Sequence, residues 1–213
     1  GIGASEGVAV APAFLHRRPE LEVERRTVSD VEQEMERLHQ ALDQARQELT
    51  TLQEKVAQED EEAGRIFEFQ RSMLEDPTLV EAFEEQIETA SSNAEAAVEP
   101  VIDQWVEQFE TGEDERMRLR SADVRDAGRR LLHVLLGEEP ERPLSALPDA
   151  VIVIAQNLTP SETAQLDREK VEGLCTAAGG ATSHAAILAR TWRLPAVVGV
   201  GEALLEVEDS TPL

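Results

Sequence analysis

The chain has 213 residues, of which 41% are hydrophobic and 30% are charged, and its formal net charge is -24. This length suits one or two domains with cores of their own, and the excess of carboxylates argues against nucleic acid, whose phosphates recruit Lys and Arg. The single cysteine, Cys175, excludes an internal disulfide and a cysteine-based zinc cluster. No apolar run reaches ~18 residues, which excludes a membrane span. The cytoplasm is therefore the expected location.

The chain opens with one predicted strand, which a long helix follows. Residues 5–15 alternate weakly and are expected to form a strand that Pro12 interrupts. Ser29 and Glu32 match a capping box that would start the helix. Apolar residues then recur at steps of four and three, which places them on one stripe of an antiparallel hairpin or bundle. They are Val31, Met35, Leu38, Leu42, Ala45, Leu49, Leu52 and Val56.

The helical pattern continues to Gly137. Further helices are predicted over residues 64–74, 77–89, 93–109 and 114–136. Asp76 and Pro77 would end one helix and start the next, Asn93 would cap the fourth, and Gly137 would end the fifth. Pro100 is expected to kink the fourth helix or to delay its start, because proline deletes a backbone donor and crowds the preceding turn.

After a proline-rich linker at residues 138–148, the pattern changes to alternating strands and helices. Strands are expected at 150–155, 170–176 and 195–200, with a capped helix beginning at Thr159 and a second helix over 183–192. This order predicts an α/β layer with parallel pairing. The simplest assembly is an α/β domain made of residues 1–20 and 140–213, with a helical subdomain, residues 21–139, inserted into it.

Residues 177–201 are the stretch most suited to chemistry. Gly179 and Gly180 permit a tight turn, and a helix then begins around Thr182, Ser183 and His184. A helix amino terminus presents unpaired N–H groups and partial positive charge, which suit a phosphate. The same charge disfavours a second proton on His184, and a neutral imidazole is nucleophilic. From the residues alone, a capping or partly buried structural histidine is an equal alternative.

The segments GGATSHAAILAR and LPAVVGVG resemble the phosphohistidine signature shared by Enzyme I, pyruvate phosphate dikinase and phosphoenolpyruvate synthase. GIGASEGVAVAPA, LTPSETAQL and SADVRDAGRRLL are similar to Enzyme I of the sugar phosphotransferase system in particular. This resemblance covers nearly the whole chain. It implies an α/β phosphohistidine (swivelling) domain with an inserted all-α helical bundle that binds the carrier protein HPr.

The resemblance also implies roles for single residues. Nε2 of His184 would accept a phosphoryl group from phosphoenolpyruvate and donate it to HPr, and the hydroxyl of Thr163 would hydrogen-bond the histidine. Gly179, Gly180, Thr182 and Ser183 would form the active-site loop. The residues that would fall at the HPr surface are Glu61, Glu62, Met73, Asp76 and Arg120. Pro77 and Thr78 depart from the acids common in relatives and suggest a modified carrier interface.

In that family a carboxyl-terminal barrel binds phosphoenolpyruvate and Mg2+ and forms the homodimer. We therefore expect this chain to be a monomer without a cofactor that exchanges phosphoryl with HPr but does not take it from phosphoenolpyruvate. Alternatives are a paralogue of the nitrogen-regulatory or dihydroxyacetone system, a dikinase or synthase domain, and a non-enzymatic binding module. The acidity fits a basic protein partner, or salt adaptation. His16, His39 and His133 are expected to be structural or solvated, and Cys175 to be a buried thiol.

Overall fold

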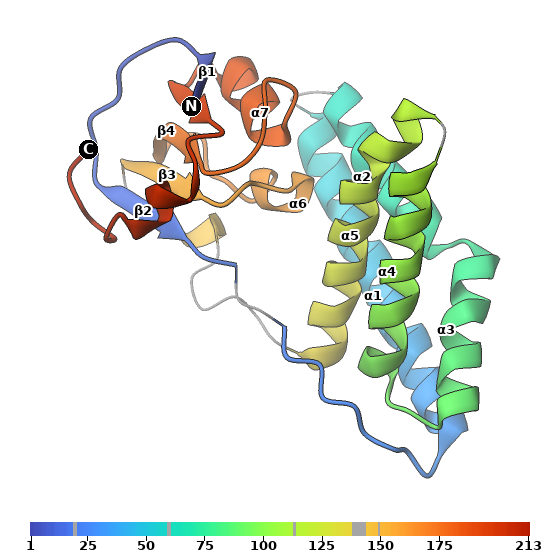
Figure 1. Ribbon diagram of the computed structural model, residues 1–213. Coiled ribbons are helices and arrows are strands. Elements are labelled where there is room, and N and C mark those ends of the chain that lie inside the picture. Colours follow the sequence, from blue (N-terminus) through green and yellow to red (C-terminus); the bar gives the residue numbers. More distant parts are fainter. Residues whose placement is uncertain (19–20, 59–60, 113, 138–143, 149) are drawn as a thin grey trace. The chain divides into compact units, whose positions relative to one another are not determined.

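The structure is a computed structural model that describes residues 1–18, 21–58, 61–112, 114–137, 144–148 and 150–213. It does not describe the side chains of Glu62, Ala63, Glu115, Arg116 and Leu119, which lie within helices. The chain divides into two compact units, Gly1–Pro19 with Pro140–Leu213, and Glu20–Glu139 (Figure 1). A helical unit is thus inserted into an α/β unit, which confirms the predicted fold class.

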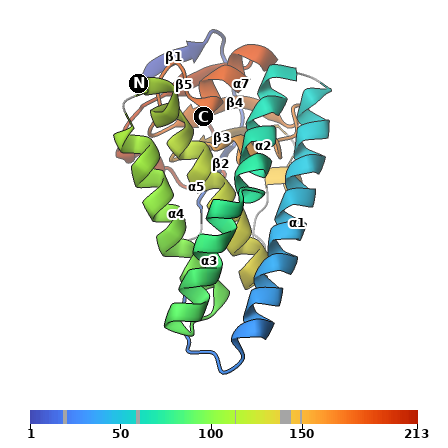
Figure 2. The ribbon, with the colours of Figure 1, turned by 90° about the vertical axis from the view of Figure 1, so that its right-hand side faces the viewer.

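The described part of the helical unit contains α1 (Val31–Ala57), α2 (Glu61–Leu74), α3 (Pro77–Ala90), α4 (Ala94–Thr111) and α5 (Glu115–Leu136), side by side in Figure 2. Leu38, Leu42 and Leu49 on the predicted stripe of α1 are at most 1% exposed. Met35 and Leu52, nearer its ends, are only partly buried. The stripe therefore supplies the core along the middle of α1, as the periodicity predicts.

Two helix boundaries test the sequence predictions. Helix α1 is capped by Asp30, whose carboxylate accepts a hydrogen bond from the Gln33 N–H at 3.0 Å, so the predicted capping box at Ser29 and Glu32 is wrong by one residue. Asp30 makes the same kind of bond and adds a negative charge that the helix amino terminus favours. Helix α5 ends as predicted, because Gly137 adopts a φ of 65° that permits the left-handed turn.

Pro100 lies inside α4, and the helix begins six residues earlier at Ala94, so the expected later start is wrong. The flanking residues Val98 and Val101 are at most 3% exposed. Burial of these apolar side chains stabilises the helix by more than the missing backbone hydrogen bond destabilises it.

The α/β unit is built on a five-stranded sheet in the described residues, with the order β1-β5-β4-β3-β2. The strands are β1 (Ile2–Ser5), β2 (Ala13–His16), β3 (Val151–Ala155), β4 (Val171–Thr176) and β5 (Ala196–Val198). Strands β2 to β5 pair in parallel as predicted, and β1 pairs antiparallel with β5. The single strand expected over 5–15 is wrong: β1 and β2 lie at opposite edges, and Gly7, at a φ of 140°, lies in the segment between them.

Helices cover one face of this sheet. Ala186 and Ala189 of α7 (His184–Trp192) pack in one cluster with Val153 of β3 and Val198 of β5. The opposite face carries a second cluster around Ile154, over which the short 3-10 helix η2 (Glu202–Glu206) places its leucines. The short helix α6 (Pro160–Thr163) follows β3, and α7 follows β4. Because parallel strands end at one edge of the sheet, the loops that lead into α6 and α7 lie at the same edge.

Most of the predicted linker, residues 138–148, lies outside the described residues; Leu144–Ala146 within it form one 3-10 turn, η1. Among the described helices, none combines the length and the apolar character that crossing a membrane requires.

Candidate active site

His184 is the first residue of α7, directly after the loop that leaves β4. Ser183 caps the helix: its hydroxyl oxygen accepts a hydrogen bond from the Ala186 N–H at 3.4 Å. The His184 side chain is partly exposed, which leaves it accessible at the positively polarised end of a nine-residue helix. The sequence placed this histidine correctly at a helix amino terminus.

The two glycines before His184 have different structural requirements. Gly179 has a φ of 100°, and a Cβ there would meet the Ser183 Cβ and Oγ at 3.2 Å. No atom lies within 4 Å of the Cβ position of Gly180, and Thr182 is exposed. Gly179 is therefore required by the conformation of the loop, whereas Gly180 leaves space beside it.

Hydrogen bonds within the loop and from the segment after β5 fix its conformation. The Thr176 hydroxyl donates to the Ala178 carbonyl at 2.7 Å, and the N–H groups of Val200 and Gly201 donate to the carbonyls of Thr176 and Ala177 at 3.1 and 2.9 Å. Gly199 has a φ of 63°, and a Cβ there would stand 2.8 Å from the Gly179 carbonyl oxygen. Gly199 was not predicted as a site residue, although it lies in the LPAVVGVG segment.

Thr163 ends α6 and is 8% exposed. Its hydroxyl donates to the Pro160 carbonyl at 2.8 Å, and α6 packs against α7, the helix that begins with His184. With its proton committed to Pro160, the hydroxyl oxygen of Thr163 keeps lone pairs and can only accept a further hydrogen bond.

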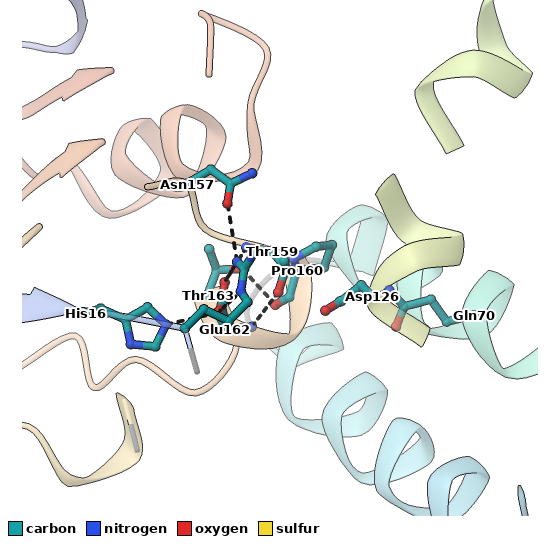
Figure 3. A network of polar contacts seen from close by, with 9 residues as sticks. His16, Gln70, Asp126, Asn157, Thr159, Pro160, Glu162 and Thr163 are labelled. Atoms are coloured by element: carbon teal, nitrogen blue, oxygen red, sulfur yellow. Dashed lines mark hydrogen bonds and ion pairs between the residues drawn. The ribbon is translucent and has the colours of Figure 1, made fainter. Parts of the chain in front are cut away.

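The capping box predicted at Thr159 and Glu162 is present. The Thr159 hydroxyl oxygen accepts from the Glu162 N–H at 3.2 Å, and a Glu162 carboxylate oxygen accepts from the Thr159 N–H at 2.9 Å. Nε2 of His16 also donates to Glu162 at 2.9 Å (Figure 3). Nε of Arg18 donates to the same carboxylate oxygen at 2.9 Å. Burial alone would raise the pKa of Glu162, but the hydrogen bonds from His16 and Arg18 and the charge of Arg18 lower it to about 2.

His16, expected to be structural or solvated, is thus a partly buried partner of the LTPSET turn. No local pattern in the sequence predicts this contact, since 146 positions separate His16 from Glu162. His39, in the helical unit, pairs with Glu84 at 2.6 Å and is 52% exposed. Cys175, expected to be buried, is only partly buried in β4, and this burial raises the pKa of its thiol.

The residues predicted for the HPr surface differ in exposure. Glu61, the first residue of α2, is exposed. Met73 is 5% exposed and belongs to the core of the helical unit. The Asp76 carboxylate caps α3 by accepting from the Thr78 N–H at 2.8 Å, which gives the Asp-Pro-Thr segment a structural role. The side chain of Glu62 lies outside the described residues.

Arg120 lies at the amino-terminal part of α5 and is partly exposed. Its guanidinium stands 4.6 Å from the centroid of the Phe69 ring and pairs with Asp123 at 3.2 Å. Phe69 in turn meets Phe109 edge to face, with 6.3 Å between ring centroids. Arg120 is therefore held on an aromatic surface that was not predicted from the sequence.

A metal site is not offered by the parts of the chain that the structure describes, where no group of three or more His, Cys, Asp or Glu side chains could hold an ion. These residues therefore do not fit a Mg2+ site, and no step of the chemistry below passes through a metal.

Comparisons with known proteins match both parts of the chain. A family model described as "PEP-utilising enzyme, N-terminal" matches residues 1–120, and one described as "PEP-utilising enzyme, mobile domain" matches residues 147–213. A phosphoenolpyruvate-protein phosphotransferase of Listeria innocua is 43% identical over 208 residues, and one of Bacillus subtilis is 42% identical over 204. These alignments cover 97% and 95% of this chain but only 36% of each relative.

Solved structures agree with these relatives. An NMR solution structure of Enzyme I has a TM-score of 0.82 at 37% identity and covers 100% of this chain and 86% of that one. A structure titled "N-terminal domain of Enzyme 1 - Nitrogen" has a TM-score of 0.65 at 30% identity and covers 92% of this chain and 81% of that one. The similarity to the first of these is the greater by both measures.

Proposed function

Because the chain belongs to the PEP-utilising enzyme family, whose members similar to it are phosphoenolpyruvate-protein phosphotransferases, we propose that it carries a phosphoryl group on His184 and exchanges it with HPr. The observation that carries this proposal is the position of His184. It is a partly exposed imidazole at the first position of α7, beside a loop that Gly179 shapes and the segment 199–201 supports.

The chemistry proposed is reversible in-line transfer between two imidazoles. The lone pair of His184 Nε2 attacks the phosphorus of the carrier's phosphohistidine, a new N–P bond forms, and the N–P bond of the carrier breaks. The electrons of the broken bond return to the carrier's ring nitrogen. Such transfers depend on positioning and on electrostatic stabilisation. The amino terminus of α7 supplies partial positive charge next to the arriving phosphoryl group.

Thr163 would orient the ring. Since its proton is committed to the Pro160 carbonyl, its oxygen would accept a hydrogen bond from an imidazole N–H and so leave the other nitrogen with its lone pair. A nitrogen that carries no proton is the nucleophilic one.

The helical unit would bind the carrier. A formal net charge of -24 favours a partner with basic residues, which long-range attraction would bring to the surface. Glu61, which is exposed, and Arg120, which is partly exposed, are the proposed contact residues because a carrier could reach both side chains. Met73 and Asp76 would shape this surface from within, because one is buried and the other caps α3.

Phosphoenolpyruvate and Mg2+ would act elsewhere. The chain spans 36% of the length of the curated relatives, and the described residues offer no metal site. We propose that the remaining length of a full protein binds phosphoenolpyruvate and Mg2+ and forms a homodimer. This chain, a monomer in the cytoplasm, would serve the transfer to and from HPr. Sugar uptake is the proposed pathway.

A nitrogen-regulatory paralogue is the second candidate. The structure titled "N-terminal domain of Enzyme 1 - Nitrogen" supports it, but at a lower TM-score and identity than Enzyme I. Transfer rates with the carrier of each system would separate the two. The dihydroxyacetone paralogue would be detected by the same comparison, and a dikinase or synthase by nucleotide-dependent labelling of His184.

Incubation with phospho-HPr tests the proposal. We expect a mass gain of one phosphoryl group on the peptide that contains His184, and its loss in His184→Ala. Labelled phosphoenolpyruvate with Mg2+ is expected to leave the chain unlabelled. Transfer that persists in His184→Ala would refute the assignment of His184 as the phosphorylated residue. Rapid labelling by phosphoenolpyruvate would refute the proposal that phosphoenolpyruvate binds in the remaining length of the full protein.

A further inference from the structure

A cluster of His16, Arg18 and Glu162 anchors the short helix α6 to strand β2. The Glu162 carboxylate accepts hydrogen bonds from Nε2 of His16 and Nε of Arg18, each at 2.9 Å, and pairs with a second guanidinium nitrogen of Arg18. Arg18 also donates to the side-chain oxygen of Asn157 at 3.3 Å, in the segment that leads into α6. The His16 and Glu162 side chains are 9% and 14% exposed. Figure 3 shows His16 beside Glu162, with Asn157 on the segment that leads into α6.

Helix α6 depends on such an anchor because it has only four residues. A helix this short does not repay the cost of its own nucleation, so side-chain contacts must fix its position. Glu162 makes both kinds of contact: its carboxylate closes the capping box with the Thr159 N–H and receives His16 and Arg18. His16 is the last residue of β2, which pairs with β3, so the anchor is part of the sheet.

The next residue along the chain, Thr163, faces another direction, because consecutive residues on a helix are about 100° apart. It is buried in the same turn, which packs against α7. A shift of the turn would therefore move the Thr163 hydroxyl relative to the first residue of α7, which is His184.

We infer that His16, Arg18 and Glu162 are positioning residues for phosphoryl transfer at His184, acting through Thr163. This inference rests on the proposed function for its kinetic consequences. The cluster would hold the turn of residues 159–163 so that the Thr163 oxygen meets the His184 ring in one geometry. The nucleophilic nitrogen would then point toward the incoming carrier. None of the three residues would touch the phosphoryl group.

Two readouts test the inference: steady-state exchange with phospho-HPr, and the ring nitrogen NMR signals of His184 in the unphosphorylated protein. Glu162→Gln keeps an oxygen for the Thr159 N–H but removes the charge that pairs with Arg18. Since a misplacement of about 1 Å costs on the order of 100-fold in rate, we expect kcat to fall by about 10- to 100-fold with KM changed less than about twofold. The His184 ring signals should move. Arg18→Ala should act in the same direction, and Arg18→Lys should recover part of the rate.

Two matched variants control for loss of charge and for loss of a His–Glu pair. Glu172→Gln removes one carboxylate from an exposed position of β4 in the same unit. Glu84→Gln breaks the pair with His39 in the helical unit. Both should leave kcat and the His184 ring signals unchanged.

A double-mutant cycle with Thr163→Ala tests the route of the effect. If Glu162 acts through Thr163, Glu162→Gln should cost little further rate once Thr163 is alanine, because the two losses are then not additive. Losses that multiply fully in the double variant would overturn the inference.

Unchanged kcat and unmoved ring signals in Glu162→Gln would also overturn it. Should Glu162→Gln fail to fold, Arg18→Ala decides, since Arg18 is 30% exposed and its removal disturbs packing less. If the wild-type chain exchanges no phosphoryl with HPr, the proposed function fails. The ring signals still decide whether the cluster positions His184.

Discussion

Replacing Gly199 by alanine tests how closely the segment after β5 supports the loop that precedes His184. Gly199 has a φ of 63°, and an added Cβ would stand 2.8 Å from the carbonyl oxygen of Gly179. The left-handed conformation costs a non-glycine residue about 1–2 kcal/mol. The close contact forces the backbone of the loop to move, at a cost of about 1–3 kcal/mol. We therefore expect Gly199→Ala to lower the free energy of unfolding by the sum of the two costs, about 2–5 kcal/mol.

Gly137→Ala is the matched control, because Gly137 has a φ of 65° and no atom within 4 Å of its Cβ position. Gly137→Ala should therefore lower the free energy of unfolding only by the cost of the left-handed conformation, about 1–2 kcal/mol. Urea unfolding followed by circular dichroism would measure both variants. Exchange with phospho-HPr should fall by about 10-fold or more in Gly199→Ala, because the displaced loop holds His184, and should stay unchanged in Gly137→Ala. Equal stability losses in the two variants, together with an unchanged exchange rate, would refute the reasoning.

Three other predictions concern stability. Arg37→Ala leaves the Glu95 carboxylate, which is 2% exposed, without its guanidinium partner. The free energy of unfolding in urea should fall by about 2–3 kcal/mol, less than for a fully buried pair because Arg37 is 37% exposed. A fall below about 0.5 kcal/mol would contradict this prediction. The pKa of Glu162 is lowered from 4.5 to about 2. The ionised carboxylate therefore contributes at most about 3 kcal/mol to the free energy of unfolding. This contribution is present above pH 4.5 and is lost as the pH falls toward 2. The difference in unfolding free energy between wild type and Glu162→Gln should therefore shrink over that range, and a difference independent of pH would count against it. Met73→Ala should destabilise the helical unit by about 2–4 kcal/mol, because Met73 is 5% exposed. A variant of unchanged stability with an altered KM for HPr would instead indicate that Met73 contacts the carrier.

Local signals predicted much of the fold. The stripe on α1, the capping box at Thr159 and the glycine that ends α5 each depend on residues within a few positions of one another. Strand β3 was predicted for the same reason, since all of Val151–Ala155 is buried and apolar. Such features are fixed by side-chain periodicity and by backbone hydrogen bonds of one segment, which a single sequence displays.

The errors came where two local choices were equally good or where distant segments decided the outcome. Ser29 and Asp30 both cap helices well, and only the backbone geometry selects Asp30. Residues 5–15 alternate like one strand, but β1 pairs with β5 and β2 pairs with β3, on opposite edges of the sheet. Pairing partners more than 130 positions away therefore settled where each strand begins and ends.

The residues of the candidate site fall into the same two groups: those that local sequence predicts and those that depend on distant segments. His184 and its loop form one continuous segment, so their glycines and helix start were visible in the sequence. The support of that segment comes from elsewhere: the N–H groups of Val200 and Gly201 hold the loop, and His16 reaches the LTPSET turn through Glu162 across 146 positions. A histidine on a short strand carries no local mark of such a role. The reactive group of a phosphoryl-transfer site can thus be found from its own segment, whereas the residues that set its geometry require the fold, because parallel strand ends bring them to one edge of the sheet.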